Sequence, residues 1–245
     1  MNIGAPVTSY SSFTVFDPGG NVASAEDDRF VPVYDRTPST FGADRYLLTQ
    51  APDSATFKGV EITARLASRQ FLLLGGATAG MAQGTAASRG FGPLENDQTL
   101  PGELLVTPNN GTLARGRLFN DRAYTIKLTG IYHLPAQVSV GAIARYQDGQ
   151  PFARMLLFPA LNQGADAVRA FANGDSRFTY IGTLDLRLQK QFAAGGGRWT
   201  AYVDGYNLVN LSNSVEEQVA AAPNVRITTA IQPPRAFHVG GRVTF

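Results

Sequence analysis

Cysteine is absent from the 245-residue chain, and histidine occurs only as His133 and His238. The chain therefore has no disulfide framework, no thiolate metal site and no cysteine nucleophile, and two histidines cannot form a histidine-rich site. Charged residues make up 16% of the sequence, against about 25% in an ordinary soluble domain. The net charge of +2 is spread over isolated arginines without a basic run, so nucleic acid is not an expected partner.

Long apolar runs are also absent. No stretch of the sequence approaches the ~18 apolar residues that a membrane helix needs. Barrel strands need only ~10 residues of alternating character, so a membrane location stays open. The segment Met1–Pro6 has neither a basic n-region nor an apolar h-region and is not a signal peptide. For an exported protein, we therefore expect that the signal was removed or that the chain is part of a longer polypeptide.

What the sequence does contain is a series of segments with apolar and polar residues in alternation, separated by glycine- and proline-rich turns, as expected of strands. The segments expected to form the main strands are 10–16, 55–66, 71–81, 122–132, 137–147, 178–192, 199–206 and 237–245. A short apolar run covers 30–34, and the patch Met155–Phe158 is expected to form a short strand outside the main sheet. Residues 216–222 could form one or two helical turns.

The connections between these segments alternate strictly between short and long. Those at 67–70, 133–136 and 193–197 are short, and those at 17–54, 83–120, 148–177 and 210–233 are long. All short turns then lie at one end of the sheet and all long loops at the other. This asymmetry is typical of bacterial outer-membrane barrels. We therefore expect an all-β fold, an antiparallel up-and-down transmembrane β-barrel segment of about eight strands with short periplasmic turns and long extracellular loops.

The final strand is expected to carry a sorting signal. Its apolar face comprises Phe237, Val239, Val243 and Phe245, and the barrel-assembly machinery pairs with such a strand by β-augmentation. The alternative is an ordinary strand. The polar faces of the strands are expected to line a wet lumen or to contact a plug through ion pairs. The charged residues expected there are Glu61, Arg65, Lys127, Arg145, Asp185, Arg187, Asp204 and Arg242.

Few residues suggest a catalytic or metal-binding role. Asp17, Asp27 and Asp28 lie in a glycine-rich loop and are weak calcium candidates, because Ca²⁺ prefers oxygen ligands; their spacing is not that of an EF-hand, and a solvated polar loop is the alternative. The sequence has no nucleophile-elbow motif, no phosphate-binding glycine loop and no zinc motif. We therefore expect no enzymatic activity and no cofactor other than calcium.

Several short motifs stand in an order that is familiar from one family. They are Thr14–Gly19 with Glu26–Asp28, Phe57–Glu61, Asp121-Arg122, Tyr132–Pro135, Gly149–Arg154, Asp185–Leu188 with Lys190 and Phe192, Asn207–Asn210, and Pro234–Phe237 with Arg242–Phe245. With them the chain resembles the C-terminal β-barrel part of the TonB-dependent outer-membrane receptors, most closely the Oar-like subgroup that carries a carboxypeptidase-regulatory-like domain.

This resemblance implies a segment, over residues 1–245, that contributes the barrel wall and ligand-facing loops for energy-coupled uptake across the bacterial outer membrane. The expected partners are outer-membrane lipid and the barrel-assembly machinery. The family's barrel has about 22 strands and a plug, whereas this chain has about eight strands, no plug and no candidate TonB box. The TonB complex is therefore expected to act only through a missing N-terminal plug.

Two other functions remain open at this point. A self-contained eight-stranded outer-membrane barrel with a structural or adhesive role requires the 10–16 strand to pair with the last strand, because lipid does not tolerate an open edge. A soluble carbohydrate-binding sandwich requires the apolar faces to meet in a dry core. The alternation alone is compatible with a membrane barrel and with a soluble sheet.

Overall fold

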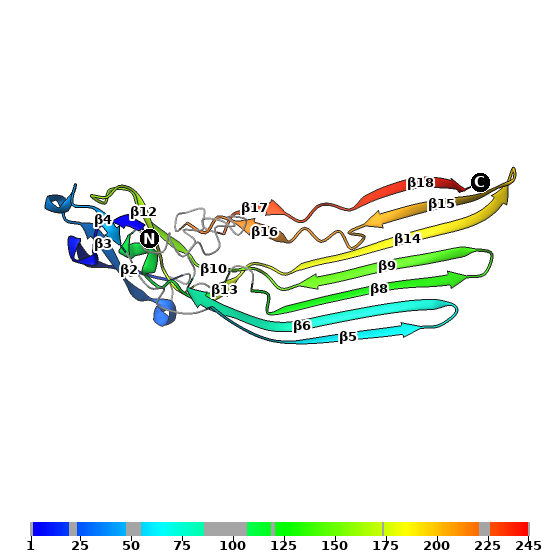
Figure 1. Cartoon of the computed structure of the whole chain (residues 1–245), viewed down its shortest axis with the longest axis horizontal. Helices are drawn as coiled ribbons and strands as arrows, with labels where there is room; N and C mark the ends of the chain where they lie inside the picture. The colour runs from blue at the N-terminus through cyan, green and yellow to red at the C-terminus, as the bar shows by residue number, and fades with distance from the viewer. Residues whose placement is uncertain are drawn as a thin grey trace.

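A computed structural model describes residues 2–19, 24–47, 55–85, 107–118, 121–172, 174–220 and 226–244. The molecule is elongated, with a long antiparallel sheet at one end and a group of small hairpins at the other (Figure 1). The three short turns of the sheet lie at the end away from these hairpins, together with the end of the last strand. The sorting of short and long connections that the sequence predicts is therefore confirmed.

The long sheet is an up-and-down meander in which each strand pairs with its neighbours along the chain. In spatial order its strands are β18 (Ala236–Thr244), β15 (Gly197–Tyr206), β14 (Ile181–Ala194), β9 (Val138–Gln147), β8 (Tyr124–Leu134), β6 (Phe71–Thr85) and β5 (Thr56–Ala67), and the short β7 (Arg115–Arg117) also pairs with β6. Each of these seven long strands overlaps a segment that the alternation of the sequence predicts.

The short turns are stabilised by their own residues. In the turn between β5 and β6, the Ser68 hydroxyl accepts hydrogen bonds from the backbone N–H groups of Gln70 and Phe71. Between β14 and β15, Gly195 and Gly196 have φ values of 58° and 79°, which glycine adopts without steric cost. A two-residue turn of this kind matches the twist of the strands that it joins.

The remaining elements are short and lie together at the far end of the sheet; we call this group the distal cap. Its hairpins pair β2 (Tyr10–Asp17) with β3 (Arg29–Arg36), β11 (Met155–Phe158) with β12 (Asp166–Arg169), β10 (Pro151–Phe152) with β13 (Ser176–Arg177), β16 (Ser214–Glu217) with β17 (Thr228–Ile231) and β1 (Asn2–Gly4) with β4 (Arg45–Leu47). It also contains α1 (Pro108–Gly111) and three short 3-10 segments, η1 (Val7–Ser9), η2 (Ala25–Asp27) and η3 (Pro38–Thr40). No helix in the described part of the chain is long and apolar enough to cross a membrane.

Two expectations about this region are corrected and one is confirmed. The strand at 10–16 is not the first strand of the long sheet: β2 pairs along its whole length with β3, in the region expected to be a loop. The reason is that Val31 and Val33 give β3 an apolar face that the two strands can bury together. Residues 216–222 do not begin a helix, because β16 pairs with β17 and Glu217 forms an ion pair with Arg226 across that hairpin. The prediction of a short strand at Met155–Phe158 is confirmed by β11.

The hydrophobic core lies in the distal cap. One cluster contains Val31, Val33 and Val168, with Val15, Leu156, Phe158 and Leu161 packed against it. The other contains Phe152, Ala153, Met155, Ala167, Phe178 and Val219. Successive residues of β11 and β12 point into different clusters, because side chains alternate along a strand. The β11–β12 hairpin is therefore the middle layer of the cap.

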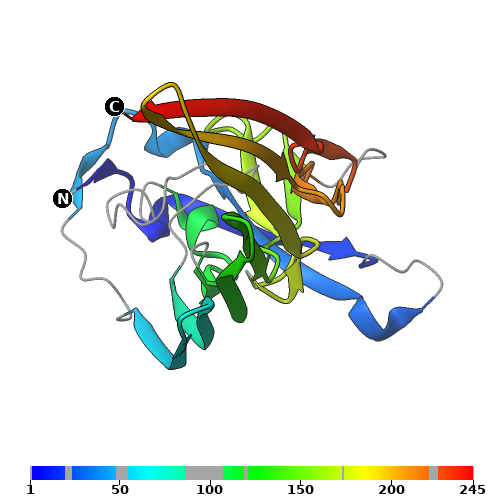
Figure 2. The same cartoon turned by 90° about the vertical axis from the view of Figure 1, so that its right-hand side faces the viewer.

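The long sheet is open. Strands β5 and β18 are the two ends of its order, and within the described residues neither pairs with the other or with β2. Seen along the strands, the sheet forms an arc, with β18 in red at one end and β5 in cyan at the other (Figure 2). An all-β antiparallel meander is thus present, but over the described ranges it does not close into a barrel of eight strands.

Candidate functional site: the two faces of the open sheet

The register places all eight predicted charged residues on one face of the sheet, which we call the polar face. Glu61 lies opposite Thr78, and Lys127 lies opposite Arg145. Arg187 lies opposite Asp204. The remaining members, Arg65, Asp185 and Arg242, follow by the two-residue period of their strands. The predicted grouping of these residues on one face therefore agrees with the strand register.

The opposite face, the apolar face, carries large hydrophobic side chains that are exposed along every strand. They include Val60, Ile62, Leu66, Leu73, Tyr124, Ile126, Leu128, Tyr132, Leu134, Tyr146, Leu188, Phe192, Trp199, Val203, Phe237 and Val239. Monomeric soluble proteins rarely expose a contiguous apolar patch of more than a few hundred Å². In the described residues no second sheet covers this face, so the dry core that a soluble sandwich requires is not present there.

The polar face is organised around the buried carboxylate of Asp204. Arg187 binds it with two hydrogen bonds, from Nε at 2.5 Å and Nη2 at 2.7 Å. The Tyr206 hydroxyl and His238 Nδ1 lie 3.4 and 3.5 Å from the same carboxylate. The Arg187 guanidinium also stacks over the Tyr202 ring at 4.4 Å. This arrangement holds one arginine in a fixed orientation on a surface that is otherwise open.

A second ion pair continues the network toward the distal cap. Arg145 Nη1 lies 3.2 Å from Asp185 Oδ2, and the other oxygen of Asp185 accepts a hydrogen bond of 2.9 Å from the backbone N–H of Asn207. Asn207 has a φ of 46°, a left-handed conformation that asparagine tolerates better than most residues. The Asn207 side chain donates to the carbonyl groups of Leu211 and Pro233. Asn207 thus connects the ends of β15 and β18.

Two hollows lie on the polar face. One has a volume of about 330 Å³ and is bordered by Thr129, Ile143, Arg145, Asp185, Arg187 and Tyr206, among others. The other, of about 450 Å³, is bordered by Phe57, Glu61, Thr78, Asp121, Arg122 and Thr125, among others. Both hollows lie on the polar face, as expected of the concave side of a curved sheet, and we therefore infer that the polar face is the inner side of the arc.

Aromatic rings cover glycines on this inner side. A Cβ atom on Gly240 would lie 2.4 Å from the Tyr202 ring, and one on Gly59 would lie 2.8 Å from the Phe57 ring. Glycine is therefore required for these rings to lie flat on the neighbouring backbone. The period-two pattern reveals neither pair, since it treats glycine as a neutral residue. Gly240 lies opposite Tyr202 on the neighbouring strand, whereas Gly59 follows Phe57 by two residues on β5, so only the Phe57-x-Gly59 spacing could have been read from the sequence.

The junction between the sheet and the distal cap contains a buried charge cluster. The Asp121 carboxylate is almost fully buried and pairs with Arg177, while Arg177 Nη1 lies 3.4 Å from Asp148. Arg122 donates to Gln150 Oε1 at 3.2 Å. Burial lowers the pKa of Arg122, and the neighbouring Arg177 cation lowers it further. Side chains from the ends of β8, β9 and β13 are thereby held together.

Several of the motifs that suggest the family resemblance lie at or near this junction. A Cβ atom on Gly149 would lie 1.7 Å from the Phe178 carbonyl oxygen, so only glycine fits there. Five residues later, Arg154 pairs with Asp17 and donates to the Gly19 carbonyl. Likewise, the Asn210 side chain accepts a hydrogen bond from the backbone N–H of Arg235 at 3.0 Å. Motifs that are far apart in the sequence are thus in direct contact.

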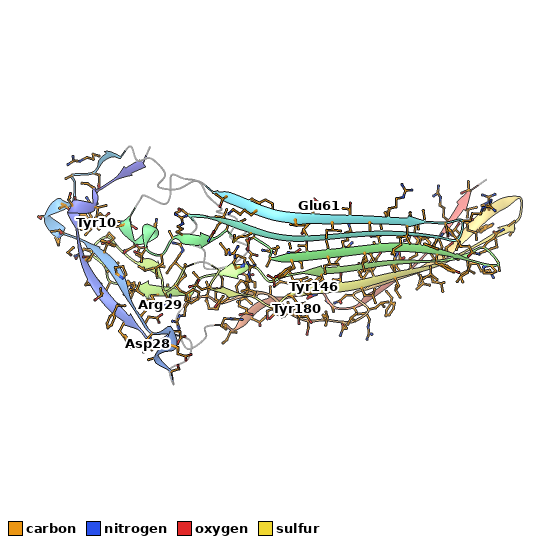
Figure 3. The ribbon with its side chains drawn as sticks, turned by 90° about the horizontal axis from the view of Figure 1, so that it is seen from below. Tyr10, Asp28, Arg29, Glu61, Tyr146 and Tyr180 are labelled. Atoms are coloured by element: carbon orange, nitrogen blue, oxygen red, sulfur yellow. The ribbon has the colours of Figure 1, made fainter. Side chains whose placement is uncertain are left out.

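The calcium candidates are not brought together as a metal site. Asp17 is buried and paired with Arg154, and the Asp27 carboxyl group packs against Gly19. Asp28 lies next to Arg29 in the cap (Figure 3). In the described ranges, no three acidic or histidine side chains are arranged to hold a metal ion. Calcium binding gains no support from these positions.

The residues of the expected assembly signal lie at one edge of the sheet. Phe237 and Val239 are on the apolar face of β18, where 67% and 73% of their surfaces are exposed, and Val243 lies opposite Trp199. Phe245 falls outside the described residues. Recognition by the assembly machinery stays a prediction.

Aromatic pairs lie near both ends of the sheet on the apolar face. Near the distal cap, the Tyr146 and Tyr180 rings are 5.3 Å apart and lie side by side (Figure 3). Near the short turns, the Phe192 and Trp199 rings are stacked at 6.5 Å, and Trp199 Nε1 donates to the Ala194 carbonyl at 3.1 Å. A pair of aromatic rings thus lies near each end of the apolar face.

Comparison with known proteins adds no family. No protein-family model matches the chain, and neither does any curated protein. The site is therefore interpreted from its own geometry.

Proposed function

We propose that this chain forms a wall segment of a larger outer-membrane β-barrel, of the kind found at the C-terminal end of TonB-dependent receptors. The observation that carries the proposal is the pair of unlike faces on an open meander, one apolar and exposed on the outer side, the other charged on the inner side. Lipid would contact the outer side, and water or a plug would contact the inner side.

The receptor role is supported by the resemblance of the motifs and by their mutual contacts. Arg122 donates to Gln150, its neighbour Asp121 pairs with Arg177, and Arg154 pairs with Asp17. These contacts attach the distal cap rigidly to the rim of the sheet. The cap would then face the outside as part of the vestibule in which a ligand is captured, while energy coupling would require a plug domain on the same polypeptide or on a partner.

The orientation of the two faces can be tested by labelling. The chain has no cysteine, so Ile62→Cys and Thr63→Cys place single thiols on opposite faces of β5. After reconstitution in lipid vesicles, the thiol at 62 should react slowly with a water-soluble maleimide and report a lipid environment, whereas the thiol at 63 should react fast. Equal, fast reaction at both positions would contradict a membrane location.

The open edges can be tested by disulfide formation. Val203 and Val239 are registered partners on β15 and β18, so the double variant Val203→Cys, Val239→Cys is the positive control and should cross-link. Cysteine at Val60, Ile62 or Ala64 of β5, each combined with Val239→Cys, should not cross-link. An efficient β5–β18 disulfide would instead favour the closed small barrel with a structural or adhesive role.

A further inference from the structure

Phe57 is the most exposed large hydrophobic side chain in the described part of the chain, with 75% of its surface accessible. It does not belong to the apolar face. By the two-residue period of β5 it shares the polar face with Glu61, where the proposed function puts water and not lipid. Contact with lipid therefore does not explain the exposure of this ring, whereas contact with a ligand would.

The Phe57 ring lies on a floor of two glycines. Gly59 and Gly80 are registered partners on β5 and β6, and a Cβ atom on Gly59 or Gly80 would lie 2.8 or 3.1 Å from the nearest ring atom of Phe57. One face of the ring is thus held against the backbone, and the ring borders the hollow of about 450 Å³. This volume falls within the range of pockets that bind small molecules. The ring forms a flat apolar platform in this hollow.

Polar groups of three strands stand beside the platform. Glu61 lies opposite Thr78, and Thr78 lies opposite Thr125, with the two threonine hydroxyls hydrogen-bonded to each other. Asp185 and Asp204, the other carboxylates of the long strands, are both paired with arginines. Glu61 differs, since the described residues provide no ion pair for it. Its carboxylate is therefore available to accept hydrogen bonds from a ligand.

The charges around the platform favour a neutral ligand. Glu61 and Arg122 both border the hollow and are opposite in charge, and the buried Asp121 is already paired with Arg177. A cation would approach Arg122, and an anion would approach Glu61. An uncharged sugar ring avoids both conflicts. Its C–H groups pack on the negative face of an aromatic ring, and its hydroxyl groups donate to carboxylates and exchange hydrogen bonds with threonine hydroxyls.

We infer that this hollow binds one ring of a neutral sugar, with the C–H face of the sugar on Phe57 and its hydroxyl groups on Glu61 and Thr78. The inference rests on the proposed function, because the polar face must line the aqueous interior of a barrel. It deepens that function by naming the chemical class of the ligand that the wall would contact.

The test uses the full chain in phosphatidylcholine nanodiscs, because alkyl-maltoside detergents would themselves supply sugar. Saturation-transfer difference NMR is recorded with cellobiose, maltose and lactose as probes. At least one of the three should receive saturation, most strongly at the C–H protons of one ring face, and the signal should saturate on titration. Absence of transfer to all three sugars overturns the inference.

Variants of the platform separate a specific site from general contact. Phe57→Ala should weaken binding of the sugar at least about fivefold, because stacking on one aromatic side chain contributes a factor of about 5 to 150 for nucleobases. Phe57→Tyr keeps a flat ring and should keep the binding. The matched control Tyr124→Ala removes a ring that is 58% exposed on the apolar face and should leave the binding unchanged. Equal losses in Phe57→Ala and Tyr124→Ala would overturn the inference.

A charged ligand is distinguished by Glu61→Gln, which keeps an oxygen acceptor but removes the charge. This variant should weaken sugar binding far less than Phe57→Ala does. Tetramethylammonium is the competing probe, since cations also bind aromatic faces; binding of this cation without binding of sugar overturns the inference. The labelling of Ile62→Cys and Thr63→Cys reports the proposed function separately. If the two thiols react as expected and no sugar binds, only the inference fails, whereas fast reaction at both counts against the proposed function.

Discussion

The long sheet and the distal cap are built from the same kind of hairpin, yet they bury their side chains in opposite ways. In the cap, Val31, Val33 and Val168 have no exposed surface, and a buried carboxylate holds the junction together. In the sheet, valines such as Val60 and Val239 are largely exposed on the apolar face. The cap thus buries its apolar side chains within itself, whereas the described sheet leaves its own exposed on one face. Under the proposed function, this difference corresponds to two surroundings, with water around the cap and lipid around the sheet.

We expect the largest loss of stability from a substitution at the junction between the long sheet and the distal cap. Asp121→Ala removes the almost fully buried carboxylate that pairs with Arg177 and leaves this partly exposed arginine only one carboxylate contact, at 3.4 Å with Asp148. Removing one partner of a buried ion pair costs about 3–5 kcal/mol, and we expect a loss at the lower end of this range because Arg177 keeps one carboxylate. We expect the amides of β11 and β12 to exchange hydrogen correspondingly faster. Asp175→Ala is the matched control, because its pair with Arg29 is exposed at 3.8 Å and such pairs contribute about 0–1 kcal/mol. Similar effects of both substitutions would show that the junction is not the anchor of the cap.

A second effect should occur only in lipid and only on one face of the sheet. Leu188→Arg places a charge on the apolar face, which costs about 2–4 kcal/mol near the middle of a bilayer. Gln189→Arg, on the next residue of the same strand, points to the polar face and should be tolerated. Urea unfolding of the chain in vesicles would measure both variants. Equal tolerance of arginine at 188 and 189 would contradict a lipid-facing surface.

The smallest effect compares the same substitution in the two regions. Val168→Ala creates a cavity in the cap and should destabilise it by about 1–2 kcal/mol, between the values for smaller and larger core deletions. Val239→Ala removes the same two methyl groups from a side chain that is 73% exposed, and should change the stability in detergent by less than about 0.5 kcal/mol. Hydrogen exchange resolved to each strand would separate the two. A larger loss at Val239 would mean that the sheet is packed against something.

The sequence predicted the parts of the fold that depend on neighbouring residues. Alternation with a period of two located the seven long strands, and it placed Glu61, Lys127 and Arg187 on one face because a strand sends successive side chains to opposite sides. The short turns at 68–70 and 195–196 were visible from local residue types. The prediction of a meander needed only these two kinds of local information.

What the sequence did not predict depends on residues far apart. The strand at 10–16 has the alternation of a sheet strand, and nothing within it shows that β3 and Val168 are its partners. The sequence likewise did not predict the full network around Asp204. Tyr202 and Tyr206 come close to Arg187 and His238 only because β14, β15 and β18 pair in this register. The exact pairing of strand edges is a property of tertiary structure and not of any one segment.

The contact between β3 and the β11–β12 region also has a consequence for the time course of folding. The Arg36 backbone N–H donates to the Gln163 side chain across 127 residues of sequence, whereas the hairpins of the sheet join strands that follow one another. Closing a long loop costs entropy before its contacts form, so distant pairings arise late. We therefore expect β5 to β9 to pair first and the β2–β3 hairpin to wait for β11 and β12. The β2–β3 hairpin, although it precedes the long sheet in the sequence, would then be among the last elements to reach its final position.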